Sequence, residues 1–344
     1  MGLHDTFRAV SVPERGLQIV NAAGKRCGLF PVTESNKGGS GFTSDYEIMR
    51  SDFCKLLYDA CDPERVQFLF GNSIEKCEEG DDGVHVTFAD GTEDTFDIVV
   101  GADGQWSKTR RLVFGEGGMQ MVKGVCIAYF SMDQEKKPDE EYLATIYMAN
   151  GGKGIMTRRH NAQKLQVYVG CSNDKAQSLK RGDISAEKKF MRDIFDGAGW
   201  RAPELMDAMD RSEDFYMERL GLVKLDKWSK GRVVLLGDAA YCPTALTGMG
   251  TSSAFIGAYV LAGELGECNG GKASIQNAFQ RYEDKFRPFM QKTVKGVKTD
   301  SGGLFPESKL GVFLTEWGFR IASMLRLYVF SSLLHDKDIK WDVP

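Results

Sequence analysis

The sequence lacks the residue patterns that mark several common classes of protein. Its eight cysteines are scattered, with no Cys-x-x-Cys pair, so neither a disulfide framework nor a zinc site is indicated. Its four histidines lie far apart, which argues against a histidine metal cluster. Lys and Arg total 44 against 48 Asp and Glu, so the basic surplus of a nucleic-acid-binding protein is missing. We therefore expect no metal and no nucleic-acid partner.

Long unbroken apolar runs are also missing. Residues 1–10 are mixed polar, so no secretory leader is expected, and free cysteines suit the cytoplasm. The most apolar stretch, 312–334, is interrupted by Glu316, Arg320 and Arg326, which a membrane-spanning helix tolerates poorly. It is predicted to be an amphipathic helix packed on the body of the protein. A helix lying on a membrane surface or on a partner is the alternative.

Hydrophobic patterning predicts a mixed α/β protein, and 344 residues suffice for one large domain or two intimate ones. A hairpin is expected over 16–31, with a turn cluster at 21–24, and a Ser- and Gly-rich loop over 33–41. Period-two patterns and short apolar runs predict strands over 66–70, 84–88, 96–100, 125–132, 142–148, 154–158, 165–169 and 232–236. Helical periodicity predicts helices over 44–61, 185–210, 254–267, 275–295 and 312–334.

The first motif with chemical meaning follows the predicted strand 96–100. It reads Gly101-Ala102-Asp103-Gly104 and continues to Arg110. The glycines let the backbone approach a ligand, and the acid can accept hydrogen bonds from a ribose or from water. Taken alone, this short pattern is equally typical of a structural turn.

The second motif is more specific. A buried strand, 232–236, runs into Gly237-Asp238, passes Pro243, and reaches Gly248-Met249-Gly250, which opens a helix. The aspartate stands where open α/β sheets bind ligands, at the carboxyl end of a strand. The free N–H groups and the positive dipole end of the helix can hold an anionic oxygen. Strand, acid, glycine turn and helix in this order indicate a ligand site.

Together the two motifs resemble the DG and GD motifs of the FAD-dependent aromatic hydroxylases. This flavoprotein monooxygenase family includes the p-hydroxybenzoate and salicylate hydroxylases and the tetracycline-inactivating monooxygenases. The segment Ile48-Met49-Arg50-Ser51-Asp52-Phe53 resembles the arginine that the family carries before a flavin-side helix. The resemblance covers about 2–295.

The resemblance implies a set of flavin contacts. Asp238 would bind the ribityl chain of FAD, residues 248–250 would lie against the pyrimidine edge of the ring, and Arg50 would contact the ribityl or ring region. Asp103 and Gly104 would lie near the pyrophosphate and the approach of the nicotinamide donor, with Arg110 completing the motif. The expected cofactor-binding residues are Arg50, Asp103, Gly104, Arg110, Gly237, Asp238, Pro243, Gly248, Met249 and Gly250.

The family's reaction implies the remaining partners. NAD(P)H reduces FAD, O₂ reacts with the reduced flavin, and one oxygen atom passes to an electron-rich substrate. The expected substrate is a small aromatic or polyketide-like molecule of secondary metabolism. Candidate contacts to it, for which core or surface positions are at least as common, are Tyr147, Met156, Arg158 and Tyr168. No catalytic acid or base is assigned, which fits the lack of a Gly-x-Ser-x-Gly nucleophile motif.

The sequence departs from the family pattern in several places. Ala245 and Ser252 stand where the family often has proline and asparagine, which puts the detail of the ring contacts in doubt. The initial strand and Gly-x-Gly-x-x-Gly turn are not found, since the glycines at 38–41 neither follow a strand nor open an apolar helix. About 50–80 residues are expected to be missing, more than one strand–helix–strand unit. A truncated gene model, a short isoform and a degenerate relative all stay open.

The expected fold is α/β, with an N-terminally truncated, Rossmann-like FAD-binding domain, a β-sheet substrate domain and C-terminal helices. FAD-binding parts are expected over 1–120, with the hairpin toward the substrate domain, and over 215–268. The substrate domain is expected over 121–214 and the C-terminal helices over 269–344. Two alternatives to a monooxygenase remain, a non-catalytic binding protein and another flavin oxidoreductase. A halogenase is disfavoured because no Trp-x-Trp-x-Ile-Pro sequence occurs.

Overall fold

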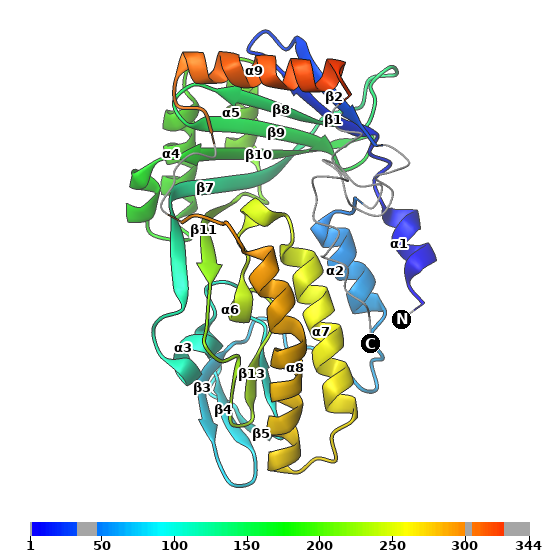
Figure 1. Ribbon diagram of the computed structural model, residues 1–344, viewed down its shortest axis with the longest axis vertical. Coiled ribbons are helices and arrows are strands. Elements are labelled where there is room, and N and C mark those ends of the chain that lie inside the picture. The colour runs from blue at the N-terminus through cyan, green and yellow to red at the C-terminus, as the bar shows by residue number, and fades with distance from the viewer. Residues whose placement is uncertain (1, 33–46, 300–304, 327–344) are drawn as a thin grey trace. The chain divides into compact units, whose positions relative to one another are not determined.

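A computed structural model describes residues 2–32, 47–299 and 305–326 and has the expected α/β fold (Figure 1). The chain divides into two compact units. Of the described residues, unit 1 comprises 2–32, 47–66, 123–219 and 305–326, and unit 2 comprises 67–122 and 220–299. The predicted loop over 33–41 lies outside the described residues, as do 44–46 and 327–334 of two predicted helices.

Unit 1 is built on a seven-stranded sheet with the order β11-β7-β10-β9-β8-β1-β2. The predicted hairpin is confirmed, and its first strand continues the sheet by pairing parallel with β8, while β8, β9, β10 and β7 pair antiparallel in turn. The strands are β1 (Gly16–Val20), β2 (Arg26–Pro31), β7 (Met119–Asp133), β8 (Leu143–Ala149), β9 (Lys153–Arg159), β10 (Lys164–Ser172) and β11 (Tyr216–Val223).

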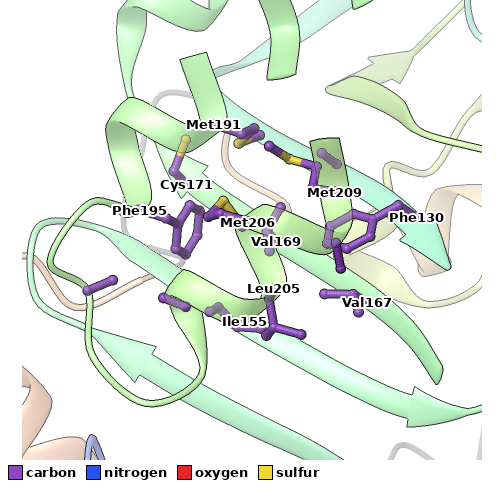
Figure 2. Close-up of a cluster of buried hydrophobic side chains, with 14 of the residues drawn as sticks. Phe130, Ile155, Val167, Val169, Cys171, Met191, Phe195, Leu205, Met206 and Met209 are labelled. Atoms are coloured by element: carbon purple, nitrogen blue, oxygen red, sulfur yellow. The ribbon is translucent and has the colours of Figure 1, made fainter. Parts of the chain in front are cut away.

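One face of this sheet is covered by α4 (Ile184–Phe195) and α5 (Ala202–Arg211). Because side chains alternate along a strand, every second residue of β7, β9 and β10 points into this core. Figure 2 shows the result, with residues of the strands packed against residues of the helices. The labelled side chains are Phe130, Ile155, Val167, Val169, Cys171, Met191, Phe195, Leu205, Met206 and Met209.

The opposite face of the sheet is covered at its β1–β2 end. Helix α9 (Lys309–Met324) packs Phe319 against Ile19 and Phe30. Phe305 lies over Gly154 and Gly170, which are paired in register. A Cβ on Gly154 would come within 2.9 Å of the Phe305 ring, so this close packing requires glycine.

Two further helices belong to unit 1, α1 (His4–Val10) and α2 (Arg50–Asp59). The rings of Phe7 and Phe53 meet edge to face at 6.0 Å, which packs the two helices together. A short 3-10 helix, η2 (Asp174–Ser178), follows β10. Of these three helices, the sequence periodicity predicts only α2.

Within its described residues, unit 2 contains two small sheets, four α-helices and one short 3-10 helix, η3 (Ala245–Thr247). In one sheet the order is β12-β13-β6, with β13 and β6 parallel, and the other is the antiparallel meander β3-β4-β5. The strands are β3 (Ile74–Glu79), β4 (Val84–Phe88), β5 (Glu93–Phe96), β6 (Val99–Gly101), β12 (Ser229–Lys230) and β13 (Val233–Leu235). The helices are α3 (Lys108–Phe114), α6 (Asp238–Tyr241), α7 (Gly250–Gly266) and α8 (Lys272–Thr293).

The core of unit 2 contains a cluster of aromatic side chains. Helices α7 and α8 run side by side (Figure 1), and Phe279, Tyr282 and Phe286 of α8 belong to the same buried cluster as Trp228 and Tyr241. The hydroxyl of Tyr282 donates to the Leu235 carbonyl at 3.3 Å, which joins α8 to β13. This packing fixes the strand whose end carries the second motif.

Two predicted strands are wrong. Residues 66–70 form no strand, because a strand needs a hydrogen-bonded neighbour and none of the described residues pairs with them. Their side chains are exposed, with Phe70 at 78%. The predicted strand 96–100 is divided between β5, which ends at Phe96, and β6, which begins at Val99.

The two compact units also differ from the expected domain boundaries. Residues 2–32 and 47–66 group with the seven-stranded sheet, to which β1 belongs through its pairing with β8. Helix α8 groups with the second motif, because it packs on α7.

Candidate functional site

The two sequence motifs begin at the same edge of a parallel sheet. Gly101 at the end of β6 is paired in register with Leu235 at the end of β13. A Cβ on Gly101 would lie 2.7 Å from the Leu235 side chain, so the strands approach this closely only because the residue is glycine. Asp103 and Asp238 follow these strand ends, where open α/β sheets bind their ligands.

The Asp103 carboxylate orders the first motif. It accepts hydrogen bonds from the Ser107 hydroxyl, and from the backbone N–H and hydroxyl of Thr109 at 2.9 and 3.1 Å. Burial acts to raise the pKa of Asp103, but these hydrogen bonds hold the pKa below its usual value. In the same loop the backbone of Gly104 is not covered by other residues. Gly104 has φ +79°, and no atom lies within 4 Å of an added Cβ.

Arg110 joins the two motifs. It is 2% exposed, and its guanidinium donates to the Ala239 carbonyl at 2.9 Å and to the Gln105 carbonyl at 2.6 Å. Ala239 lies in α6, directly after Asp238. Arg110 is therefore a buried residue that connects the two motif loops by hydrogen bonds.

The second motif surrounds an open space. Asp238 is the first residue of α6, and Gly250 is the first residue of α7. An added Cβ on Gly250 would meet only the Asp238 carboxylate oxygen, at 4.0 Å, and one on Gly248, at φ +66°, would meet nothing. Gly237 and Thr244 also have positive φ, at +62° and +61°, Pro243 is buried, and Met249 is the residue directly before α7. The Asp238 carboxylate thus lies close to the first turn of α7, whose N–H groups have no partner within the helix.

The comparisons with known proteins decide the family. The family model for the FAD binding domain matches residues 1–297. The chain is 38% identical over 366 residues to the FAD-dependent monooxygenase asL4 of Sarocladium schorii, aligning 100% of this chain with 85% of that protein. The chain belongs to the FAD-dependent monooxygenase family, the flavoprotein aromatic hydroxylases.

Further matches agree with this membership. The flavin-dependent monooxygenase eupH of a Phoma species is 36% identical, over 100% of this chain and 85% of that protein. Among solved structures, tetracycline destructase Tet(51) matches with a TM-score of 0.73 and 25% identity, over 100% of this chain and 84% of that one. Membership supports FAD as the cofactor and a flavin-dependent oxidoreductase as the enzyme class.

The residues present fit the flavin. A Cβ added at Gly248 or Gly250 would project into space that no protein atom occupies, which leaves both backbones accessible to a flat ring. Asp238 borders the same space and can accept hydrogen bonds from ribityl hydroxyls. Nine of the ten expected cofactor residues lie in unit 2, and Arg50 lies in unit 1.

The expected substrate residues do not share one face of the seven-stranded sheet. Tyr147 is paired with Ile155 and points into the core beneath α4 and α5, where its hydroxyl donates to the Ala198 carbonyl. Met156 and Tyr168 are paired with each other and occupy the opposite face. Pleating separates them, because successive residues of a strand point to opposite sides. Tyr147 is therefore placed as a core residue.

Two tyrosines that the sequence analysis missed extend the face of Met156. Tyr129 on β7 is paired with Tyr168, and the two rings meet edge to face at 5.1 Å. The Tyr216 ring stacks on Tyr129 at 4.7 Å and is 45% exposed. Little in the sequence indicated this contact, since Tyr216 is the first residue of β11, a strand that the hydrophobic pattern did not predict. We call Tyr129, Tyr168 and Tyr216 the tyrosine cluster.

The two arginines of unit 1 have different surroundings. Arg158 is paired with two carboxylates, Glu14 and Glu47. Arg50 is exposed at the start of α2, close enough to Tyr129 that its positive charge opposes the increase in the tyrosine's pKa caused by burial.

The described residues hold no cluster of three or more His, Cys, Asp and Glu side chains suited to a metal ion. Within the same described ranges, none of the helices combines the length and apolar character needed to span a membrane.

Proposed function

We propose that this protein is an FAD-dependent monooxygenase that uses NAD(P)H and O₂ to insert one oxygen atom into an aromatic or polyketide-like small molecule. The observation that carries the proposal is the open space shared by Asp238 and Gly250 beside two parallel strand ends. The names of the relatives support the reaction class. The similarity to tetracycline destructase Tet(51), which is named for a polycyclic compound, supports a polycyclic substrate class.

When bound, FAD would accept a hydride from NAD(P)H and supply the chemistry that activates O₂. The chain's own residues would bind and orient it. Asp238 would accept hydrogen bonds from the ribityl hydroxyls, and the first N–H groups of α7 would donate to oxygens of the ring. Arg110 would hold the two motif loops together, because its guanidinium donates a hydrogen bond to a backbone carbonyl in each loop.

The tyrosine cluster would receive the substrate. Its rings offer stacking and edge contacts, each worth about 0.5–1.5 kcal/mol beyond the burial of surface, to a flat aromatic molecule. Met156 lies next to Tyr168 in register and adds an adaptable apolar contact. Apolar and aromatic walls would also exclude water from the reacting atoms.

The test is to supply the purified protein with FAD and follow NADH and NADPH oxidation in the presence of phenols and polycyclic polyketides. Products formed under ¹⁸O₂ are analysed by mass spectrometry, with Asp238→Ala as the control. Substrate-stimulated oxidation with one ¹⁸O atom in the product would support the proposal. Oxidation without ¹⁸O incorporation would favour another flavin oxidoreductase, and flavin or ligand binding without turnover a non-catalytic binding protein.

A further inference from the structure

We propose that Thr244 is a further flavin-positioning residue, whose hydroxyl group forms a hydrogen bond with FAD bound at the second motif. The inference rests on the proposed function. It concerns a residue of unit 2 that lies between Asp238 and Gly250 in the sequence and that the motif pattern did not single out. One unusual feature of its side chain and one of its backbone carry the argument.

The side chain of Thr244 is buried without a hydrogen-bond partner. The residue is 2% exposed, and its Oγ1 forms no hydrogen bond with any of the described residues. A buried hydroxyl of this kind is costly, because it gives up its hydrogen bonds to water and gains none within the protein. Few buried polar groups in folded proteins lack a partner, so this one calls for a partner that the chain itself does not supply.

The backbone of Thr244 is strained as well. It has φ +61° and ψ +150°, a conformation that is essentially reserved for glycine. Threonine is poorly suited to it, because its Cβ is branched. Within the described ranges, Thr244 alone combines a side chain at positive φ with a buried polar side-chain atom that has no partner. Two separate energetic costs therefore meet at one residue.

Hydrogen bonds connect Thr244 to the turn that is proposed to contact the flavin. Its carbonyl accepts from the Thr247 N–H at 3.3 Å and from the Thr247 hydroxyl at 3.1 Å. The same hydroxyl accepts from the N–H of Met249, the residue directly before α7, at 3.2 Å. On the other side of Thr244, the Cys242 carbonyl accepts from the Val223 N–H at 3.0 Å. Thr244 thus lies between two fixed points of the motif loop.

The strained backbone gives the buried hydroxyl a way to reach a ligand. Because Oγ1 is buried, the loop has to shift at Thr244 before the hydroxyl can contact FAD. A shift that brings φ to a negative value would relieve the backbone strain and turn the side chain at the same time. Strained residues cluster at ligand clamps for this reason. A hydroxyl both donates and accepts, so the ribityl hydroxyls and the ring oxygens of FAD are suitable partners.

The experiment titrates FAD into each protein, followed by quenching of flavin fluorescence, and measures the urea midpoint of each protein without FAD. Thr244→Val keeps the shape of the side chain and removes the hydroxyl. Its FAD affinity should fall about fivefold, as expected for one lost hydrogen bond. Its urea midpoint should stay unchanged or rise, because the unpaired hydroxyl is gone. Thr244→Ser keeps the hydroxyl and should bind FAD within about twofold of the wild type.

Thr247→Val is the matched control for stability. It is the same substitution three residues along the loop, but the Thr247 hydroxyl has a donor and an acceptor as partners. Its loss should lower the urea midpoint, because a carbonyl and an N–H each lose a hydrogen bond. The backbone is tested by Thr244→Gly, which should have a higher midpoint than Thr244→Ala, since glycine adopts positive φ without strain.

Opposite changes in affinity and stability separate positioning from a general structural role. The inference is overturned if Thr244→Val binds FAD as tightly as the wild type, or if it loses as much stability as Thr247→Val. It is also overturned if Thr244→Ser binds FAD as weakly as Thr244→Val, or if Thr244→Gly is no more stable than Thr244→Ala. Each of these results leaves FAD binding by the wild type intact, so the proposed function would stand. No saturable binding to the wild type would contradict both.

Discussion

Replacing Gly250 by alanine should separate flavin binding from folding. Gly250 begins α7 with a backbone that any residue can adopt, and the new methyl group would meet only Asp238 Oδ1, at 4.0 Å. No protein atom has to move. Alanine is favoured over glycine in a helix interior by about 1 kcal/mol, and less at the first position. The unfolding free energy of Gly250→Ala should therefore stay unchanged or rise slightly.

The same methyl group would fill the space that the flavin ring is proposed to occupy. Forcing an extra carbon into a packed contact costs about 1–3 kcal/mol, which corresponds to a loss of affinity of about 5- to 150-fold. Titration of FAD followed by flavin fluorescence measures the affinity, and urea denaturation of the flavin-free protein measures stability. The prediction is a weaker FAD complex of an equally stable protein.

Gly263→Ala is the matched control. Gly263 lies in the same helix, is exposed, and has nothing within 4 Å of an added Cβ. It should show a small gain in stability with no change in FAD affinity. If Gly250→Ala binds FAD as tightly as Gly263→Ala, the flavin does not lie against this turn and the reasoning fails.

Three other predictions follow from the described contacts. Arg110→Met should lower the unfolding free energy by about 3 kcal/mol or more, because two buried carbonyls lose bonds to a charged donor; a loss below about 1 kcal/mol in urea denaturation would contradict the tie. Tyr216→Leu should raise KM for the aromatic substrate while FAD affinity stays constant, and an unchanged KM would remove Tyr216 from the substrate surface. Burial raises the pKa of Glu14, so its contribution to stability is present at low pH and lost as pH rises through the folded value. The stability of the wild type relative to Glu14→Gln should therefore fall as the pH rises above the usual pKa of a glutamate side chain, and a flat difference would refute this.

The two motifs could be located from the sequence because each is local. A buried strand, an acid and a glycine turn follow one another within about twenty residues, as α/β ligand sites require. The structure then showed that the two motifs lie together, which their separate positions in the sequence do not indicate. Gly101 and Leu235 are 134 residues apart in the sequence and lie side by side only because β6 and β13 pair.

The proposed substrate face was less predictable, because it depends on the register between strands. Which side of the sheet Tyr147 faces follows from its pairing with Ile155, and a shift of one residue would reverse it. The partners of Arg158 lie 144 and 111 residues away, and no local pattern indicates them. The apolar residues 66–70 have strand propensity, but propensity alone forms no strand without a neighbouring strand.

The most direct test of the central claim, that the two motifs of unit 2 bind FAD, is a titration of FAD into the wild-type protein and into Asp238→Ala. The account predicts saturable binding to the wild type and affinity at least about tenfold weaker in Asp238→Ala, as expected for a lost charge-assisted hydrogen bond. Equal affinity in the two proteins, or no saturable binding to the wild type, would contradict it.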